Sequence, residues 1–187
     1  MFSKQFVKYN IISFILMFFV NTASASCTLL CNENWWRVTS VTEINTILKE
    51  ASNLNSRDKY GFRALHHAVL NGDHKKVKIL LLAGVNVNSR TDFGFTPLYF
   101  AVGSEGDEEI VTMLLDHGAL INIQNNNGIS PLHYAAWGTA RKLKLLIKAG
   151  ADIKLTTNSG LTAFDLAKDN DQLKDTEIYH LLDGSSE

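Results

Sequence analysis

Four glycines recur at a nearly constant interval and divide most of the chain into similar units. They are Gly61, Gly94, Gly128 and Gly160, separated by 33, 34 and 32 residues. A related phrase begins two residues after each of them. A period of about 20 to 50 residues is typical of stacked supersecondary units, each of which buries its apolar face only against its neighbours. The sequence therefore predicts a repeat solenoid, an architecture used more often for binding than for chemistry.

Each unit begins with the signals of a helix. Thr96-Pro97 and Ser130-Pro131 place a good N-cap residue before a proline at the first helical position, where no amide hydrogen is needed. The outer units have Arg63-Ala64 and Thr162-Ala163 instead. We therefore expect the outer units to begin their first helices less firmly.

A second helix is predicted in each unit from apolar residues three and four positions apart, which form one wide apolar face. It ends at Gly84, Gly118 or Gly150, where a left-handed residue costs little. An alternating stretch such as residues 85–88 then leads into a polar turn. The predicted unit is helix, turn, helix and hairpin-like loop, so the fold class is an all-α repeat solenoid in a single stack.

These phrases resemble the ankyrin repeat, in which Gly-x-Thr-Pro-Leu-His-x-Ala opens the first helix and Gly-Ala-Asp-x-Asn enters the loop. Repeat 2 matches through Thr96-Pro97-Leu98 and Gly118-Ala119, and repeat 3 through Pro131-Leu132-His133 and Gly150-Ala151-Asp152. The resemblance implies an N-terminal segment with a capping helix (26–57), repeats 1 to 3 (58–90, 91–124 and 125–156) and a C-terminal capping repeat (157–187).

In the ankyrin family, partners usually lie across a concave face formed by loop tips and first helices. The resemblance thus implies a protein–protein interaction module with a protein partner that the sequence does not identify. The positions that it implies for partner binding are Lys59, Tyr60, Phe62, His67, Asp92, Phe93, Phe95, Phe100, Asn127, Ile129 and Tyr134. For Phe95, Phe100 and Tyr134, the alternative is that they pack between neighbouring repeats.

The first 25 residues have the pattern of a secretory signal peptide. Two lysines precede the apolar stretch Ile11–Val20, and small residues follow it, so we expect cleavage between Ala25 and Ser26. The apolar stretch is ten residues long, well short of the ~20 that a membrane-spanning helix needs. The pattern predicts export to the periplasm or envelope, or secretion. A composition rich in Asn, Lys and Ile suggests a bacterial source.

Two cysteines, Cys27 and Cys31, stand just after the expected cleavage site. In an exported protein they can form one small disulfide or remain free thiols. The competing interpretation is a lipid on Cys27, which favours the alternative function of a membrane-tethered structural envelope protein. Membrane contact is expected only if the signal is uncut or Cys27 is lipidated. Two thiols without a nearby histidine do not supply four zinc ligands, so no metal is expected.

The charge balance argues against a nucleic-acid partner. The chain has 18 basic and 19 acidic residues, and loss of Lys4 and Lys8 with the signal leaves 16 and 19, a net charge of −3. Two basic clusters, Lys75-Lys76-Lys78 and Arg141-Lys142-Lys144-Lys148, fall on second helices. We expect them to form a solvated outer face, with an acidic partner or membrane surface as the alternative.

No phosphate-binding loop, nucleophile elbow or metal-ligand spacing occurs in the sequence. His66 and His133 fall in a structural position of the ankyrin pattern, where a hydrogen bond to the neighbouring loop is the usual role. We therefore expect a monomeric non-enzyme without cofactor or small-molecule substrate. An enzyme remains a third interpretation, favoured only by a ligand or metal near the histidines.

Overall fold

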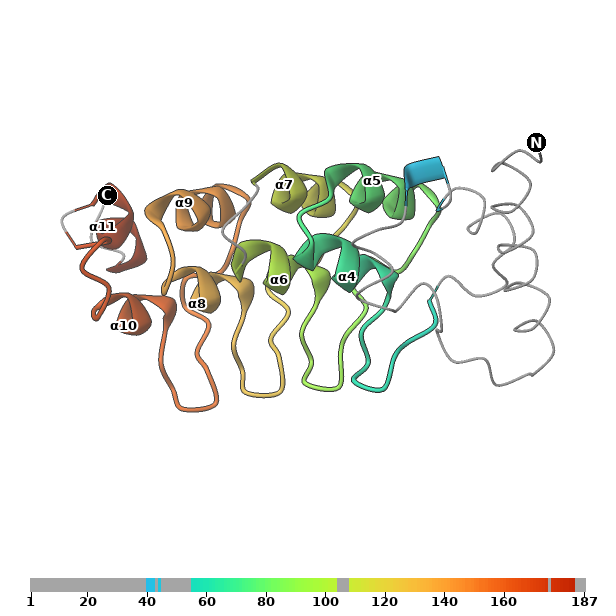
Figure 1. The fold of residues 1–187 in the computed structure, drawn as a ribbon. Coiled ribbons are helices and arrows are strands. Elements are labelled where there is room, and N and C mark those ends of the chain that lie inside the picture. The colour runs from blue at the N-terminus through green and yellow to red at the C-terminus, as the bar shows by residue number, and fades with distance from the viewer. Residues whose placement is uncertain (1–39, 43, 45–54, 104–107, 175, 184–187) are drawn as a thin grey trace, which may run out of the picture.

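The computed structural model describes residues 40–42, 44, 55–103, 108–174 and 176–183. In these ranges the chain is one row of helix pairs, with loops that project from one side of the row (Figure 1). The first helices are α4 (Ala64–Leu70), α6 (Pro97–Gly103), α8 (Pro131–Ala135) and α10 (Ala163–Ala167). The second helices are α5 (His74–Leu82), α7 (Glu108–Asp116), α9 (Ala140–Lys148) and α11 (Glu177–Asp183).

The predicted all-α repeat solenoid in a single stack is confirmed. The first helices pack side by side in one layer, α4 on α6, α6 on α8 and α8 on α10. The second helices form the other layer (Figure 1), where α5 contacts α7 and α9 contacts α11. The predicted signal peptide with its cleavage site, and Cys27 and Cys31, lie outside the described residues.

Three of the first helices, α6, α8 and α10, begin at residues whose hydroxyl groups cap them. Ser130 Oγ accepts a hydrogen bond from the His133 amide at 3.4 Å. In the last unit, Thr162 Oγ1 accepts from the Asp165 amide at 3.2 Å, and the Asp165 carboxylate accepts from the Thr162 amide at 3.0 Å. This reciprocal pair is a capping box. The expectation of a weaker start was therefore wrong for the last unit, because Asp165 supplies the second half of the cap.

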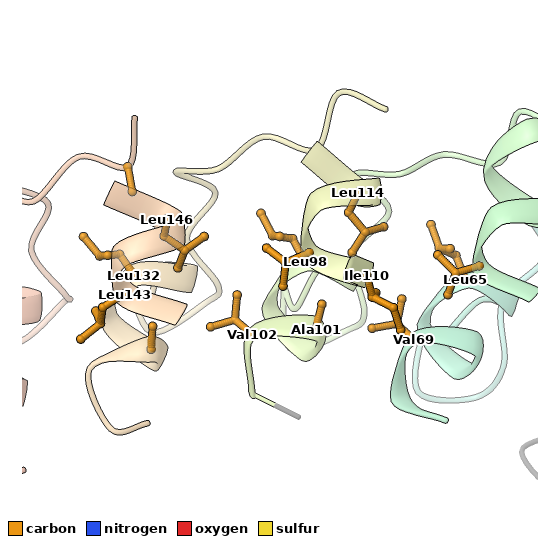
Figure 2. Close-up of a cluster of buried hydrophobic side chains, with 14 of the residues drawn as sticks. Leu65, Val69, Leu98, Ala101, Val102, Ile110, Leu114, Leu132, Leu143 and Leu146 are labelled. Atoms are coloured by element: carbon orange, nitrogen blue, oxygen red, sulfur yellow. The ribbon is translucent and has the colours of Figure 1, made fainter. Parts of the chain in front are cut away.

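The core runs through the whole stack between the two layers. Leu65, Leu98 and Leu132 occupy the same position in successive first helices, and each is only 1% exposed. Figure 2 shows them in the same cluster as Leu114 and Leu146 from the second helices. Truncating a leucine buried in such a core to alanine costs about 2 to 5 kcal/mol. Residues of successive repeats thus share one continuous core.

Two lysines of the predicted solvated clusters are buried instead. Lys142 Nζ, from α9, donates to the Val102 carbonyl at the end of α6 at 2.8 Å. Lys76 Nζ, from α5, lies 3.2 Å from Asp73 Oδ2. The last carbonyl groups of a helix lack partners within the helix, and the negative end of its dipole attracts a cation. The outer-face expectation was therefore wrong for Lys76 and Lys142.

Candidate functional site

The four projecting loops, here called fingers, have one construction. They comprise residues 58–62, 91–95, 125–129 and 157–161. In each finger the first amide donates to the fifth carbonyl, at 2.8, 2.9, 3.0 and 2.9 Å respectively. The side chain of the first residue (Asp58, Thr91, Asn125 or Thr157) accepts a bond from the fifth amide. Four different sequences therefore produce the same tight turn.

The tips of neighbouring fingers are joined by backbone hydrogen bonds. These run from Asp92 N to Tyr60 O at 3.0 Å, from Asn126 N to Phe93 O at 3.2 Å, and from Asn158 N to Asn127 O at 3.1 Å. Gly94 has a φ of 82°, and a Cβ there would lie 2.9 Å from the Asn126 amide nitrogen. Glycine is therefore required at position 94 for two reasons: the backbone conformation there is left-handed, and the next finger approaches too closely to leave room for a side chain.

A ladder of asparagines joins the bases of the fingers. Asn55, Asn88 and Asn122 hold equivalent positions, and each Oδ1 accepts from a backbone amide of the next repeat, at 2.9, 2.8 and 3.0 Å. Asn88 also donates from Nδ2 to the Gly118 carbonyl at 3.0 Å. In the last full repeat the equivalent residue is Lys154. The tip bonds and the ladder together hold the fingers in a fixed register.

Five of the candidate residues lie at the exposed finger tips. Tyr60 is 52% and Phe93 is 59% exposed. Contact of apolar rings with water is unfavourable, so covering these two rings would lower the free energy. Lys59 Nζ lies 4.7 Å from the centre of the Tyr60 ring. Asp92 forms an ion pair with Arg57, and Asn127 is exposed. The tips of repeats 1 and 2 therefore carry aromatic rings, whereas the tip of repeat 3 is polar.

Below the tips, the rings of repeats 1 to 3 contact one another. Phe95 lies on Tyr99 with ring centres 4.5 Å apart, and Tyr99 stacks on Tyr134 at 4.4 Å. Tyr134 contacts Trp137 edge-on at 5.9 Å. The further contacts are Phe93 with Phe95 at 6.3 Å, Phe95 with Phe100 at 5.6 Å, and Phe62 with Phe100 at 5.3 Å. We name the surface made by Tyr60, Phe62, Phe93, Phe95, Phe100, Tyr134 and Trp137 the aromatic face.

The remaining candidates are less exposed. Phe62, Phe95, Phe100, Ile129 and Tyr134 are half-buried. His67 is buried beneath Phe62, with ring centres 5.5 Å apart, and its Nε2 lies 3.4 Å from Asp58 Oδ2. The half-buried rings pack on their neighbours and still present part of their surface to solvent. They therefore support the exposed tips and form the floor of the face.

Sequence reasoning missed Tyr99 and Trp137. Tyr99 is buried between two rings, and burial raises its pKa to about 12. Trp137 is 51% exposed and stands six residues after Pro131, as the half-exposed Leu70 stands six residues after Ala64. This shared position in the repeat is the sequence signal that could have identified Trp137 as a surface residue of the first-helix layer.

The two histidines of the repeat phrase are structural. His66 Nδ1 accepts from the Arg63 amide at 3.0 Å, so Nε2 carries the hydrogen and donates to the Ser89 carbonyl at 3.1 Å. His133 makes the same bridge to the Leu161 carbonyl at 3.1 Å. Burial lowers the pKa of His66 to about 4 and also lowers that of His133. His133 thus bonds the next finger and His66 bonds the segment just before it, so both side chains bond the neighbouring loop, as the sequence predicted.

A scan against protein-family models identifies the repeats. The model described as ankyrin repeats (3 copies) matches residues 40–125 and 65–157, and the two matches together cover well over half of the chain. This chain is an ankyrin-repeat protein. Ankyrin repeats are generally protein–protein interaction modules, and the family is typically non-enzymatic. A search of curated protein sequences finds no match.

Two searches of the described residues bear on other kinds of site in this ankyrin-repeat protein. None of its helices there combines the length and the apolar character needed to cross a bilayer. Across the same part of the chain, no group of His, Cys, Asp or Glu side chains is arranged to hold a metal ion. The aromatic face, with its exposed rings at the tips of repeats 1 and 2, is the candidate binding site.

Proposed function

We propose that this ankyrin-repeat protein is an exported binding module that holds a protein partner on its aromatic face. The observation that supports the proposal most strongly is the exposure of Tyr60 and Phe93 at two adjacent, hydrogen-bonded finger tips. Rigid aromatic side chains bury a large area with little loss of conformational entropy, and they dominate many binding interfaces. The contacts of Phe93 with the Phe95 ring and of Tyr60 with Lys59 restrict these side chains before binding and so reduce that loss further.

The test is an affinity capture with the purified chain from envelope fractions and candidate host-cell extracts. Captured proteins are compared between the wild type and a Tyr60→Ala/Phe93→Ala variant. We expect one or a few proteins to be retained by the wild type and lost with the variant. Because both rings are at least half exposed, the variant keeps its melting temperature within a few degrees.

A matched control separates loss of the face from loss of the fold. Leu98→Ala truncates a fully buried leucine of the central repeat, so it lowers the free energy of unfolding by about 2 to 5 kcal/mol. If the double tip variant is destabilised to the same extent, Tyr60 and Phe93 belong to the core and the proposal fails. Equal capture by the wild type and the folded tip variant also contradicts it.

Export is part of the proposal and has its own measurement. The chain is produced in bacterial cells, and the intact mass of the protein in the exported fraction is compared with that of the complete sequence. Cleavage between Ala25 and Ser26 gives a chain that begins at Ser26. A mass that includes an acyl group and a first residue of Cys27 instead supports the membrane-tethered alternative.

A further inference from the structure

The helices that form the floor of the aromatic face lack charged side chains. The three first helices beneath it, α4, α6 and α8, contain no Asp, Glu, Lys or Arg. The second helices of the same repeats are rich in them, with exposed basic residues on α5 and α9 and acidic residues at the start of α7. The first-helix layer is therefore uncharged over three successive repeats, while the second-helix layer carries both signs.

The charges that border the aromatic face have partners within the chain. Asp92 is paired with Arg57, and Lys59 lies over the Tyr60 ring. Asp58 faces His67, with 3.4 Å between Oδ2 and Nε2. A charged group placed on this face would lose hydration, and opposite charges that could compensate it are already engaged. The face therefore discriminates against charged ligands as well as attracting apolar ones.

Two exposed rings, Phe93 and Trp137, lie at opposite ends of a series of ring contacts. Phe93 stands at a finger tip, and Trp137 lies two residues after the end of α8. Between them, Phe95, Tyr99 and Tyr134 form a continuous series of ring contacts. A ligand that covers both ends must lie across the finger and the first helix, because the half-buried rings occupy the space between.

We propose that the occupant of the aromatic face is an uncharged polypeptide segment with aromatic or branched aliphatic side chains. This inference rests on the proposed function and specifies the chemistry of its partner. A lipid surface fits less well, because proteins that dock on anionic membranes combine apolar side chains with cations on one face. Here Lys59 is the single lysine of the four fingers and lies over the Tyr60 ring, whereas the exposed Lys75, Lys78, Lys144 and Lys148 are carried by the second helices.

The test begins with a random peptide library displayed on phage and selected on the chain as purified from the producing cells. Peptides that bind the wild type and not the Tyr60→Ala/Phe93→Ala variant are sequenced. We expect them to be enriched in aromatic and branched aliphatic residues and depleted of Asp, Glu, Lys and Arg. A synthetic copy of the most enriched peptide should lose roughly tenfold or more in affinity for the double variant.

Two further measurements complete the test. The Kd of that peptide should change by less than about twofold between ~0.05 and ~0.5 M NaCl, because screening acts on charge pairs and not on apolar contacts. A Leu82→Ala/Leu120→Ala variant is the matched control. It removes two exposed apolar side chains that lie outside the aromatic face and should bind the peptide like the wild type.

Several outcomes would overturn the inference. One such outcome is that the enriched peptides carry charges, and another is that the Kd rises about tenfold with salt. Either would show that the face binds protein of another chemistry and would leave the proposed function intact. Failure to enrich any peptide that depends on the two tips would exclude such a segment, while the extract capture tests the function separately. If the wild type binds anionic phospholipid vesicles and the double variant does not, the face is assigned to a membrane. If the wild type forms a dimer and the double variant does not, the face is assigned to a second copy of the chain.

Discussion

His66 carries a pH dependence that follows from its position between two repeats. Its folded-state pKa of about 4 lies below the ordinary value of 6.5, because burial disfavours the charged ring. The unfolded chain therefore binds the extra proton more readily. The stabilising contribution is fully present above pH 6.5 and is lost as the pH falls from there toward 4. By linkage the loss is about 3 kcal/mol, and the lowered pKa of His133 acts in the same direction.

The measurement is urea unfolding at about pH 7 and pH 4.5, compared between the wild type and His66→Gln. Glutamine can still donate to the Ser89 carbonyl but does not titrate. We expect the wild type to lose more stability on acidification than the variant. An equal loss in both chains would mean that His66 does not supply the acid sensitivity.

At the scale of the element, the asparagine ladder sets how firmly successive fingers are joined. Asn88 makes two hydrogen bonds to the next repeat, to the Leu120 amide and the Gly118 carbonyl, whereas Lys154 occupies the same position beside the capping repeat. We expect Asn88→Ala to lower the free energy of unfolding by about 1 to 2 kcal/mol and Lys154→Ala to change it by less than about 0.5 kcal/mol. Chemical denaturation measures both, and similar losses would contradict a role for the ladder.

Elements were the most predictable part of the structure. Proline after Thr96 or Ser130, glycine at Gly84 and apolar spacing specify local backbone choices, which the sequence carries directly. The burial of Lys142 could not be predicted in this way, because its hydrogen-bond partner is a carbonyl 40 residues earlier in the chain. Tyr99 likewise depends on a ring in the next repeat. Contacts between units decide which side chains are exposed, so the tips were easier to predict than the floor of the aromatic face.

At the scale of the whole molecule, each repeat should be stabilised chiefly by its immediate neighbours. Removing residues 157–187 deletes the Leu161 carbonyl that receives His133, and Asn170, which donates to the Ala136 and Gly138 carbonyls at 3.0 and 2.9 Å. We expect amide hydrogen exchange to quicken by roughly tenfold or more in α8 and α9 and to change far less in α4 and α5. Uniform acceleration along the chain would indicate all-or-none unfolding instead.

Lys154 also has a consequence for how the last unit is joined to the rest of the stack. An ammonium group donates hydrogen bonds but accepts none, so it cannot receive a backbone amide as Asn55, Asn88 and Asn122 do. The asparagine ladder therefore stops at repeat 3, and the bonds described above for His133, Asn170 and the Asn158 amide join the last unit to it instead. One substitution of amide by amine thus makes this junction the place where we expect the stack to open first.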